Sequence, residues 1–226
     1  MENASGFTVA LIDVDGTLVS SNDAHAKSWQ AALKEFGYDV SYDRLRRMIG
    51  MGGDKVLPAI DPKLNDEADP GKSIAFRRGE IFKERYLSHL QPTNGAREML
   101  VRLHACGLKI VIASSATQAE LDALLAVADV TDLVDLSTTS DDAGQSKPAP
   151  EIIEVALKKA KTPSTTAVMI GDTPYDIEAA TKAGVPTVAF RCGGWDNVGL
   201  KDAIAVYDDP ADLLTKLEES PFSASC

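Results

Sequence analysis

The sequence predicts an α/β protein: a doubly wound, Rossmann-like parallel sheet with an all-helical domain inserted into it. Short apolar runs alternate with amphipathic helical stretches along most of the 226-residue chain. The runs are continuous rather than alternating, as expected for strands that are covered on both faces. The segment 20–91 departs from this alternation, because it contains several helical stretches and no convincing strand.

The predicted strands are short and apolar, and helices with recognisable ends lie between them. The stretch NGAREMLVRLHACG ends at Gly107, and TPYDIEAATKAG ends at Gly184, a residue type favoured just past a helix. PAPEIIEVALKKA begins with proline and ends with lysines, which suit the two ends of a helix. Strand–helix alternation of this kind predicts a parallel sheet with helices on both faces. The strands are expected at 7–12, 108–113, 133–136, 167–170 and 186–190, with 203–207 as a further candidate.

The helical segment is too long for an ordinary connection and is predicted to form a second, small domain. HAKSWQAALKEFG has helical periodicity and places Trp29 in its core, whereas 61–72, rich in Pro, Asp and Asn, is predicted as a loop. The core domain is therefore expected to comprise residues 1–19 and 92–226, and the helical domain residues 20–91.

Composition excludes some partners. The formal net charge of −11 argues against binding to nucleic acid or to an anionic membrane surface, while a small anionic substrate stays possible if a metal ion reverses the local field. No stretch reaches the ~18 apolar residues of a membrane span, and no signal peptide is recognised, so a cytoplasmic location is expected. The three cysteines lack a CxxC spacing and are expected to be free thiols in a reducing compartment. The choice between monomer and dimer stays open.

Two acidic residues directly follow the first predicted strand, in the stretch LIDVDGTLVS. Alternate residues of an extended chain point to the same side, about 6.6–7 Å apart, so Asp13 and Asp15 can face one point beyond the strand. The following Gly16 and Thr17 supply flexibility, backbone N–H groups and a hydroxyl that can hold anionic oxygens. In isolation the pair is also compatible with an acidic turn.

Polar residues follow three other predicted strands in the same way. They are Ser114 and Ser115 after the second strand, Lys147 in SKPAP after the third, and Asp172 and Asp176 in GDTPYD after the fourth. Ligands of an open parallel sheet bind beyond the carboxyl ends of its strands, so the clusters are expected to converge there. The last two aspartates are also expected to serve as helix N-cap and first-turn acid.

This combination of residues indicates phosphoryl transfer. Three or four carboxylates cannot lie together in ionised form without a cation, and oxygen ligands of this kind suit Mg²⁺. Lys147 and the hydroxyl of Ser114 would then bind a negative group such as a phosphoryl group. A carboxylate nucleophile, a nearby acid, a metal and a lysine complete the set that such a reaction requires.

The motifs DxDGT, Ser after a strand, SKPxP and GDxxxD, in that order, resemble the haloacid dehalogenase (HAD) superfamily. The resemblance covers nearly the whole chain and looks closest to the branch with a helical cap inserted after the first motif, which includes phosphoglycolate phosphatases and β-phosphoglucomutases. It implies that Asp13 is the nucleophile that forms an aspartyl-phosphate, and that Asp15 is the general acid and base. Thr17 and Ser114 would bind phosphoryl oxygens, and Lys147 would stabilise their charge.

The resemblance also implies a metal site and further substrate contacts. Asp13 and Asp172 would bind Mg²⁺ directly, Asp15 through its backbone carbonyl, and Asp176 directly or through water. Gly16 and Ser115 are grouped with the substrate-binding residues.

Residues of the helical domain have two interpretations each. His25 either faces the site or packs at the start of a helix. GMGGDK at 50–55 either caps a helix or places Lys55 on the substrate. Arg77 and Arg78 either both lie on a solvated helix face, or one of them reaches the leaving group.

The resulting prediction is a Mg²⁺-dependent phosphatase for a small phosphorylated metabolite, similar to phosphoglycolate or a sugar phosphate. The acid at position 15 disfavours dehalogenases and phosphonatases. A sugar phosphomutase is the alternative within the family, although the cap loop and the turn SSATQ lack the basic residues expected of one. A phospho-acceptor signalling domain is the alternative of another class, and both motif order and the helical insert oppose it.

Overall fold

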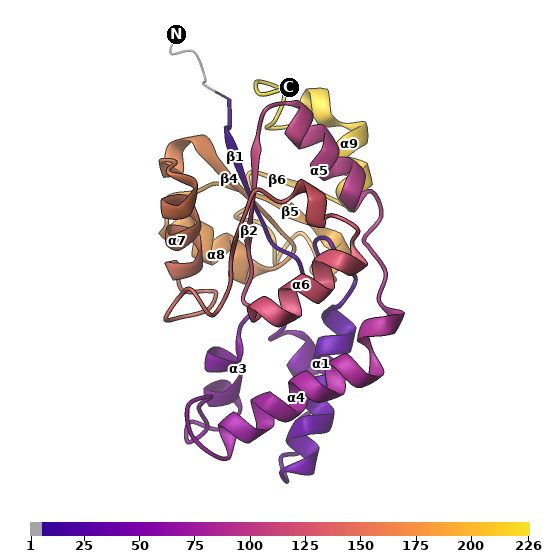
Figure 1. Cartoon of the computed structure of the whole chain (residues 1–226), viewed down its shortest axis with the longest axis vertical. Helices are drawn as coiled ribbons and strands as arrows, with labels where there is room; N and C mark the ends of the chain where they lie inside the picture. The colour runs from indigo at the N-terminus through magenta and orange to yellow at the C-terminus, as the bar shows by residue number, and fades with distance from the viewer. Residues whose placement is uncertain (1–5) are drawn as a thin grey trace. The chain divides into compact units, whose positions relative to one another are not determined.

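The computed structural model describes residues 6–226, and within them the chain forms one parallel sheet (Figure 1). The sheet order is β3-β2-β1-β4-β5-β6, so neighbours lie on both sides of the first strand and the predicted doubly wound topology is confirmed. The six strands are β1 Val9–Ile12, β2 Lys109–Ala113, β3 Leu136–Thr138, β4 Ala167–Gly171, β5 Thr187–Phe190 and β6 Ala205–Tyr207.

Strand β1 lies at the centre of the sheet and pairs in parallel with β2 on one side and β4 on the other. All of its residues are buried, which explains why its sequence is a continuous apolar run. Val9 and Leu11 belong to a core cluster that includes residues of the helices α7 (Glu151–Ala160) and α8 (Pro174–Lys182).

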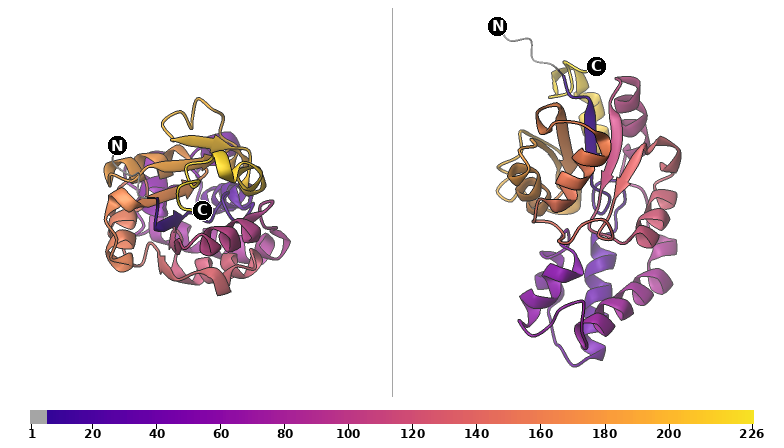
Figure 2. Two further views of the ribbon diagram at one scale, coloured as in Figure 1. Left: turned by 90° about the horizontal axis from the view of Figure 1, so that it is seen from above. Right: turned by 60° about the vertical axis from the view of Figure 1, so that its left-hand side comes forward.

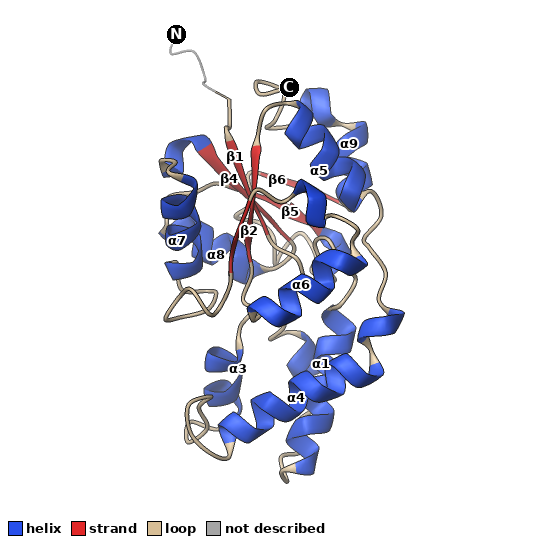
Figure 3. Ribbon diagram, in the orientation of Figure 1, coloured by secondary structure: helices blue, strands red, loops and turns tan. Residues whose placement is uncertain are grey.

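Helices cover both faces of this sheet (Figures 2 and 3). α7 and α8 pack on one face, while α5 (Ala96–Ala105) and α9 (Pro210–Thr215) pack together on the other. Helix α6 (Gln118–Val127), which follows β2, lacks a strong sequence signal and was not predicted. Gly107 and Gly184 follow α5 and α8 with φ angles of 85° and 73°, so the two predicted glycine helix ends are confirmed.

The third strand was predicted about three residues too early. Leu133, the first residue of the predicted run, ends a short 3₁₀ turn (Thr131–Leu133), and pairing with β2 begins only at Leu136. The strand then continues through Ser137 and the fully buried Thr138. Hydrophobicity alone misplaces this strand, because two of its three residues, Ser137 and Thr138, are polar.

The chain divides into two compact units. One contains the sheet and comprises the described residues up to Ser20 together with Gln91–Cys226, and the other is the helical segment Ser21–Leu90. The helical unit contains α1 Asn22–Glu35, α2 Tyr42–Arg46, α3 Gly53–Ile60 and α4 Gly71–Arg85.

The helical unit has a hydrophobic core of its own. Trp29 is buried in that core, as predicted, together with Leu33 and residues from each of the other helices. Helix α3 begins at Gly53, inside the stretch that was predicted to cap a helix or to form a loop over the substrate. Most of 61–72 is irregular, in agreement with the predicted loop.

The expectation of free thiols is wrong for two of the cysteines. Cys106 and Cys226 form a disulfide across 120 residues of sequence, and Cys192 alone is free. The segment after α9 returns to the start of β1, where the ring edge of Phe222 contacts Phe7, with 6.0 Å between ring centroids. The spacing of the cysteines in the sequence could not show that Cys106 and Cys226 lie close together. Because these two cysteines form a disulfide, the cysteine content no longer supports the inference of a reducing compartment. Among residues 6–226, none of the helices combines the length and apolar character that a membrane crossing requires.

The central strand should carry a large share of the stability. Leu11 has no exposed surface, so Leu11→Ala is expected to lower the free energy of unfolding by about 2–5 kcal/mol. Val198 is 76% exposed, and Val198→Ala should leave that free energy nearly unchanged. Urea unfolding of both variants measures the difference, and equal effects of the two would contradict this core.

The disulfide predicts the number of reactive thiols. Denatured but unreduced protein should react with a thiol reagent at one cysteine per chain, Cys192, because the other two are bonded to each other. After reduction, all three cysteines of the chain should react. Three reactive thiols before reduction would show that the bond does not form.

Candidate active site

Asp13 lies at the carboxyl end of β1, where the chain leaves the sheet. Its N–H still donates to the carbonyl of Ile170 in β4, at 2.9 Å. Asp13 and Val14 are both buried, and Asp15 beyond them is half-buried. The chain then reverses at Gly16, whose φ of 82° favours glycine.

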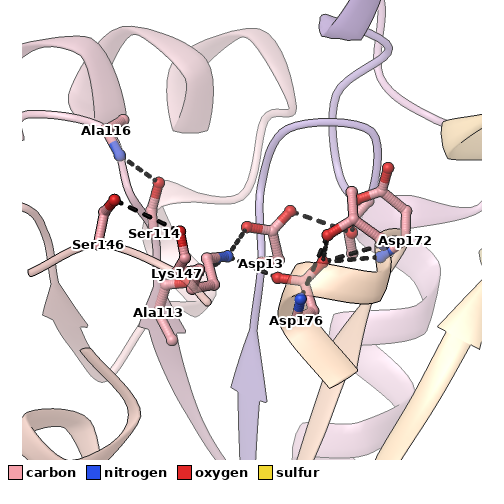
Figure 4. A network of polar contacts seen from close by, with 10 residues as sticks. Asp13, Ala113, Ser114, Ala116, Ser146, Lys147, Asp172 and Asp176 are labelled. Atoms are coloured by element: carbon pink, nitrogen blue, oxygen red, sulfur yellow. Dashed lines mark hydrogen bonds and ion pairs between the residues drawn. The ribbon is translucent and has the colours of Figure 1, made fainter. Parts of the chain in front are cut away.

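Lys147 lies beside Asp13 and is fully buried (Figure 4). Its ammonium group donates to Asp13 Oδ1, to Asp176 Oδ1 at 2.6 Å and to the carbonyl oxygen of Ala113 at 3.2 Å. All its contacts here are oxygen acceptors, so the loop after β3 delivers one positive charge between two carboxylates.

Asp172 and Asp176 come from the end of β4 and the first turn of α8. Thr173 is the N-cap of α8, and its side chain and that of Asp176 form a capping box. Asp176 is therefore the predicted first-turn acid, whereas the prediction of Asp172 as the N-cap is wrong. The signal for Thr173 was present in the sequence as a threonine three residues before an acid, with proline directly after it.

Thr17 lies between two acidic loops, the loop after β1 with Asp13 and Asp15 and the loop after β4 with Asp172. Its hydroxyl lies 3.3 Å from Asp13 Oδ2 and 3.2 Å from Asp172 Oδ1. Thr17 itself has no exposed surface, and its carbonyl accepts a hydrogen bond from the hydroxyl of Thr93 at 2.6 Å. The residue predicted to bind phosphoryl oxygens is thus held next to both carboxylates.

Ser114 and Ser115 follow β2 on the other side of Lys147. Ser114 is buried, and its Oγ accepts a hydrogen bond from the N–H of Ala116 at 3.1 Å (Figure 4). Ser115 is half-buried. The carbonyl of Ala113, directly before them, is the one that Lys147 contacts, so the second strand end also belongs to the site.

Three buried carboxylates form a group that fits a divalent cation. Asp13, Asp172 and Asp176 each offer an oxygen, and these oxygens lie within 4.8 Å of one another. Lys147 supplies only one positive charge against them, so the group has an excess of negative charge. An all-oxygen donor set of this kind suits Mg²⁺. Asp15 does not belong to this group of three.

Burial determines the charges of the site. It raises the pKa of Asp13 to about 7, an effect that the nearby Lys147 ammonium opposes. Burial alone would lower the pKa of Lys147, but the carboxylates of Asp13 and Asp176 raise it above its usual value. The lysine therefore stays charged, and Asp13 ionises less readily than an exposed aspartate would.

The substrate contacts predicted in the helical unit have local partners there. His25 is buried and stacks on Phe82, with 4.1 Å between ring centroids and 8° between ring planes. Its Nδ1 lies 3.5 Å from Nη1 of Arg78, whose guanidinium lies 5.3 Å from the centre of the Trp29 ring. Arg78 is thus half-buried against aromatic rings, and the prediction of a solvated arginine is wrong for it.

Two other basic residues of the helical unit pair with acidic side chains. Arg77 is paired with Glu35 at 2.7 Å on the surface, as predicted. Lys55 lies in α3, with its ammonium 3.5 Å from the carboxylate of Asp54. The predicted roles of His25 and Lys55 toward a substrate stay predictions.

The fold and these motifs define a family. Residues 10–190 match the model of the haloacid dehalogenase-like hydrolases, and the chain belongs to that family. It is therefore an enzyme of the hydrolase class, and the resemblance recognised in the sequence is confirmed.

Relatives along most of the chain include enzymes that act on phosphorylated compounds. The chain is 28% identical over 219 residues to the phosphoglycolate phosphatase of Aquifex aeolicus, covering 93% of this chain and 96% of that protein. It is 28% identical over 216 residues to the pyrophosphatase PpaX of Listeria innocua, covering 92% and 94%.

Solved structures share the whole architecture. A hydrolase from Pseudomonas syringae superimposes with a TM-score of 0.87 at 29% identity, covering 94% of this chain and 98% of that one. A β-phosphoglucomutase from Clostridium difficile has a TM-score of 0.81 at 18% identity, covering 96% and 97%, and this likeness shows the fold alone.

The buried lysine predicts a large stability effect. Lys147→Met leaves Asp13 and Asp176 buried without their counter-charge, and should lower the free energy of unfolding by about 3–5 kcal/mol in metal-free protein. The surface lysine Lys216, which pairs with Asp212 on the same helical face, provides the control, and Lys216→Met should be nearly neutral. Equal stability of the two variants by urea unfolding would contradict the assigned contacts.

Proposed function

We propose that this hydrolase is a Mg²⁺-dependent phosphatase that hydrolyses a small-molecule phosphate monoester through an aspartyl-phosphate on Asp13. The observation that carries the proposal is the position of Asp13, which is in contact with Lys147 on one side and near Thr17 on the other. A carboxylate held between a lysine and a hydroxyl is suited to attack a phosphoryl group whose oxygens those donors bind. The phosphoglycolate phosphatase and pyrophosphatase among the relatives support this class of substrate.

In the first half-reaction, the Asp13 oxygen on the Lys147 side attacks the phosphorus atom. The bond between phosphorus and the leaving oxygen breaks, and the carboxyl group of Asp15 gives its proton to that oxygen. Lys147, Thr17 and Ser114 bind the oxygens of the phosphoryl group during the transfer. Half-burial of Asp15 suits this role, because its side chain can exchange protons with solvent.

In the second half-reaction, a water molecule attacks the phosphorus atom of the aspartyl-phosphate. Asp15, now a carboxylate, accepts a proton from this water. The bond between Asp13 and phosphorus breaks, inorganic phosphate leaves, and the Asp13 carboxylate is restored. Asp15 thus acts as a general acid in the first half-reaction and as a general base in the second, and the proton it gives up in the first is replaced in the second.

Mg²⁺ would be held by Asp13, Asp172 and the backbone carbonyl of Asp15, and it would neutralise negative charge on the phosphoryl group. For Asp176, predicted to bind the ion directly or through water, the contacts favour the indirect role. Its Oδ1 accepts from Lys147, and its Oδ2 accepts from the hydroxyl and the N–H of Thr173 and lies 3.3 Å from the N–H of Asp172. With both oxygens engaged, Asp176 would contact the ion through water and orient the lysine.

The helical unit is proposed to be the cap that selects the leaving group, with His25 and Lys55 among its substrate-binding residues. The stacking of His25 on Phe82 fixes the orientation of the imidazole, and Arg78 beside it adds positive charge. Such a surface suits a small anionic leaving group better than an apolar one.

Asp13→Asn tests the mechanism. The amide is a far weaker nucleophile, so phosphate release should fall by roughly 10³-fold or more. Asp122, exposed on α6, provides the matched control, and Asp122→Asn should leave turnover unchanged. The measurement is continuous phosphate release from phosphoglycolate, β-glucose 1-phosphate and inorganic pyrophosphate, with Mg²⁺ and with a chelator.

The outcomes separate the alternatives. Normal turnover by Asp13→Asn, or full activity with the chelator, would contradict the mechanism. Conversion of β-glucose 1-phosphate to the 6-phosphate without phosphate release would identify a mutase. A single phosphorylation without turnover would identify a phospho-acceptor domain.

A further inference from the structure

The segment 191–195, which follows β5, contacts both acidic loops of the site. The thiol of Cys192 donates to the carbonyl oxygen of Gly16, at 3.2 Å. The ring of Trp195 meets that of Tyr175 edge-on, with 6.3 Å between ring centroids and 89° between ring planes. Gly16 belongs to the loop after β1, and Tyr175 to the first turn of α8, so the 191–195 segment joins the two.

The other side of this segment is firmly anchored. The N–H of Cys192 donates to the carbonyl oxygen of Asp208, at 2.9 Å, directly after β6. The guanidinium of Arg191 donates to Asp208 Oδ1 and to Asn197 Oδ1, each at 2.7 Å. The backbone of the segment is therefore held in place from both directions.

Gly193 lies at the point where this backbone passes Asp172. An alanine methyl group at position 193 would lie 1.7 Å from Asp172 Oδ2 and 2.4 Å from its Cγ. Gly193 is buried and is not among the glycines with positive φ, so alanine is compatible with its backbone conformation. Position 193 therefore requires glycine because the carboxylate of Asp172 occupies the space that a Cβ atom would fill.

We propose that Gly193 is a positioning residue, whose backbone forms the wall that holds the Asp172 carboxylate in its metal-binding orientation. On the opposite side, the hydroxyl of Thr17 donates to Asp172 Oδ1. One oxygen is thus held by a hydrogen bond and the other by close packing, which leaves the side chain a single orientation. This inference rests on the proposed function, because it concerns the Mg²⁺ site assigned there.

Preorganisation of this kind contributes directly to metal affinity. A carboxylate that must be reoriented before it binds an ion loses affinity, and residues that hold ligands in place typically affect metal binding by about 10–100-fold. The Asp172 side chain is fully buried, so it has no solvent-exposed space into which it can move easily. A methyl group at position 193 must therefore displace the Asp172 carboxylate from its present position.

Gly193→Ala tests the proposal, with Gly79→Ala as the matched control. A methyl group at Gly79 meets nothing within 4 Å, so the same substitution is sterically free there. MgCl₂ is titrated into the metal-free, full-length protein by calorimetry, with no substrate present. The dissociation constant for Mg²⁺ should rise by about 10–100-fold in Gly193→Ala and stay unchanged in Gly79→Ala. A folded Gly193→Ala variant with the affinity of the unmodified protein would overturn the proposal.

Two further measurements keep the outcomes distinct. If Gly193→Ala does not fold, Cys192→Ala is measured instead, because it removes only the hydrogen bond to Gly16. A Mg²⁺ affinity reduced about 3-fold or more would support positioning by this segment. An unchanged Mg²⁺ affinity would overturn it. If the unmodified protein binds no Mg²⁺ at all, the proposed function itself fails. If it binds Mg²⁺ and Gly193→Ala binds equally well, only the role of Gly193 fails.

Discussion

A single buried ammonium group holds the site together. Lys147 has no exposed surface and contacts the carboxylate that follows β1, a carboxylate in the first turn of α8 and the carbonyl of the last residue of β2. A buried charge is tolerated only when it is paired and hydrogen-bonded, and the same is true of each carboxylate. The loops after β1, β2, β3 and β4 therefore depend on one another electrostatically, in addition to their positions at one edge of the sheet.

Folding and chemistry share residues at this edge. Asp176 completes the capping box of α8, accepts the Lys147 ammonium and belongs to the candidate metal group. Thr17 packs in a fully buried position and also bridges the two acidic loops. The helical unit, in contrast, has its own core around Trp29, so its helices are stabilised by contacts among themselves. The proposed catalytic residues thus all belong to the sheet unit, where rigid strands set their geometry.

Much of this was predictable because it depends on local patterns. The continuous apolar runs at 7–12, 108–113, 167–170 and 186–190 located four strands to within a few residues, because a buried parallel strand requires such a run. The third strand was misplaced because most of its residues are polar, including the fully buried Thr138. The disulfide between Cys106 and Cys226 was missed because a separation of 120 residues carries no information about distance in space.

By itself, the sequence determined the order of strands and helices, the family, and the residue types that gather at the carboxyl ends of the strands. These follow from hydrophobic periodicity and from motifs whose spacing is a few residues. Only the tertiary structure decided that Lys147 lies between Asp13 and Asp176, that Thr17 bridges to Asp172, and that Gly193 leaves room for that carboxylate. Such contacts join residues far apart in the chain, and their distances depend on how the sheet and helices pack.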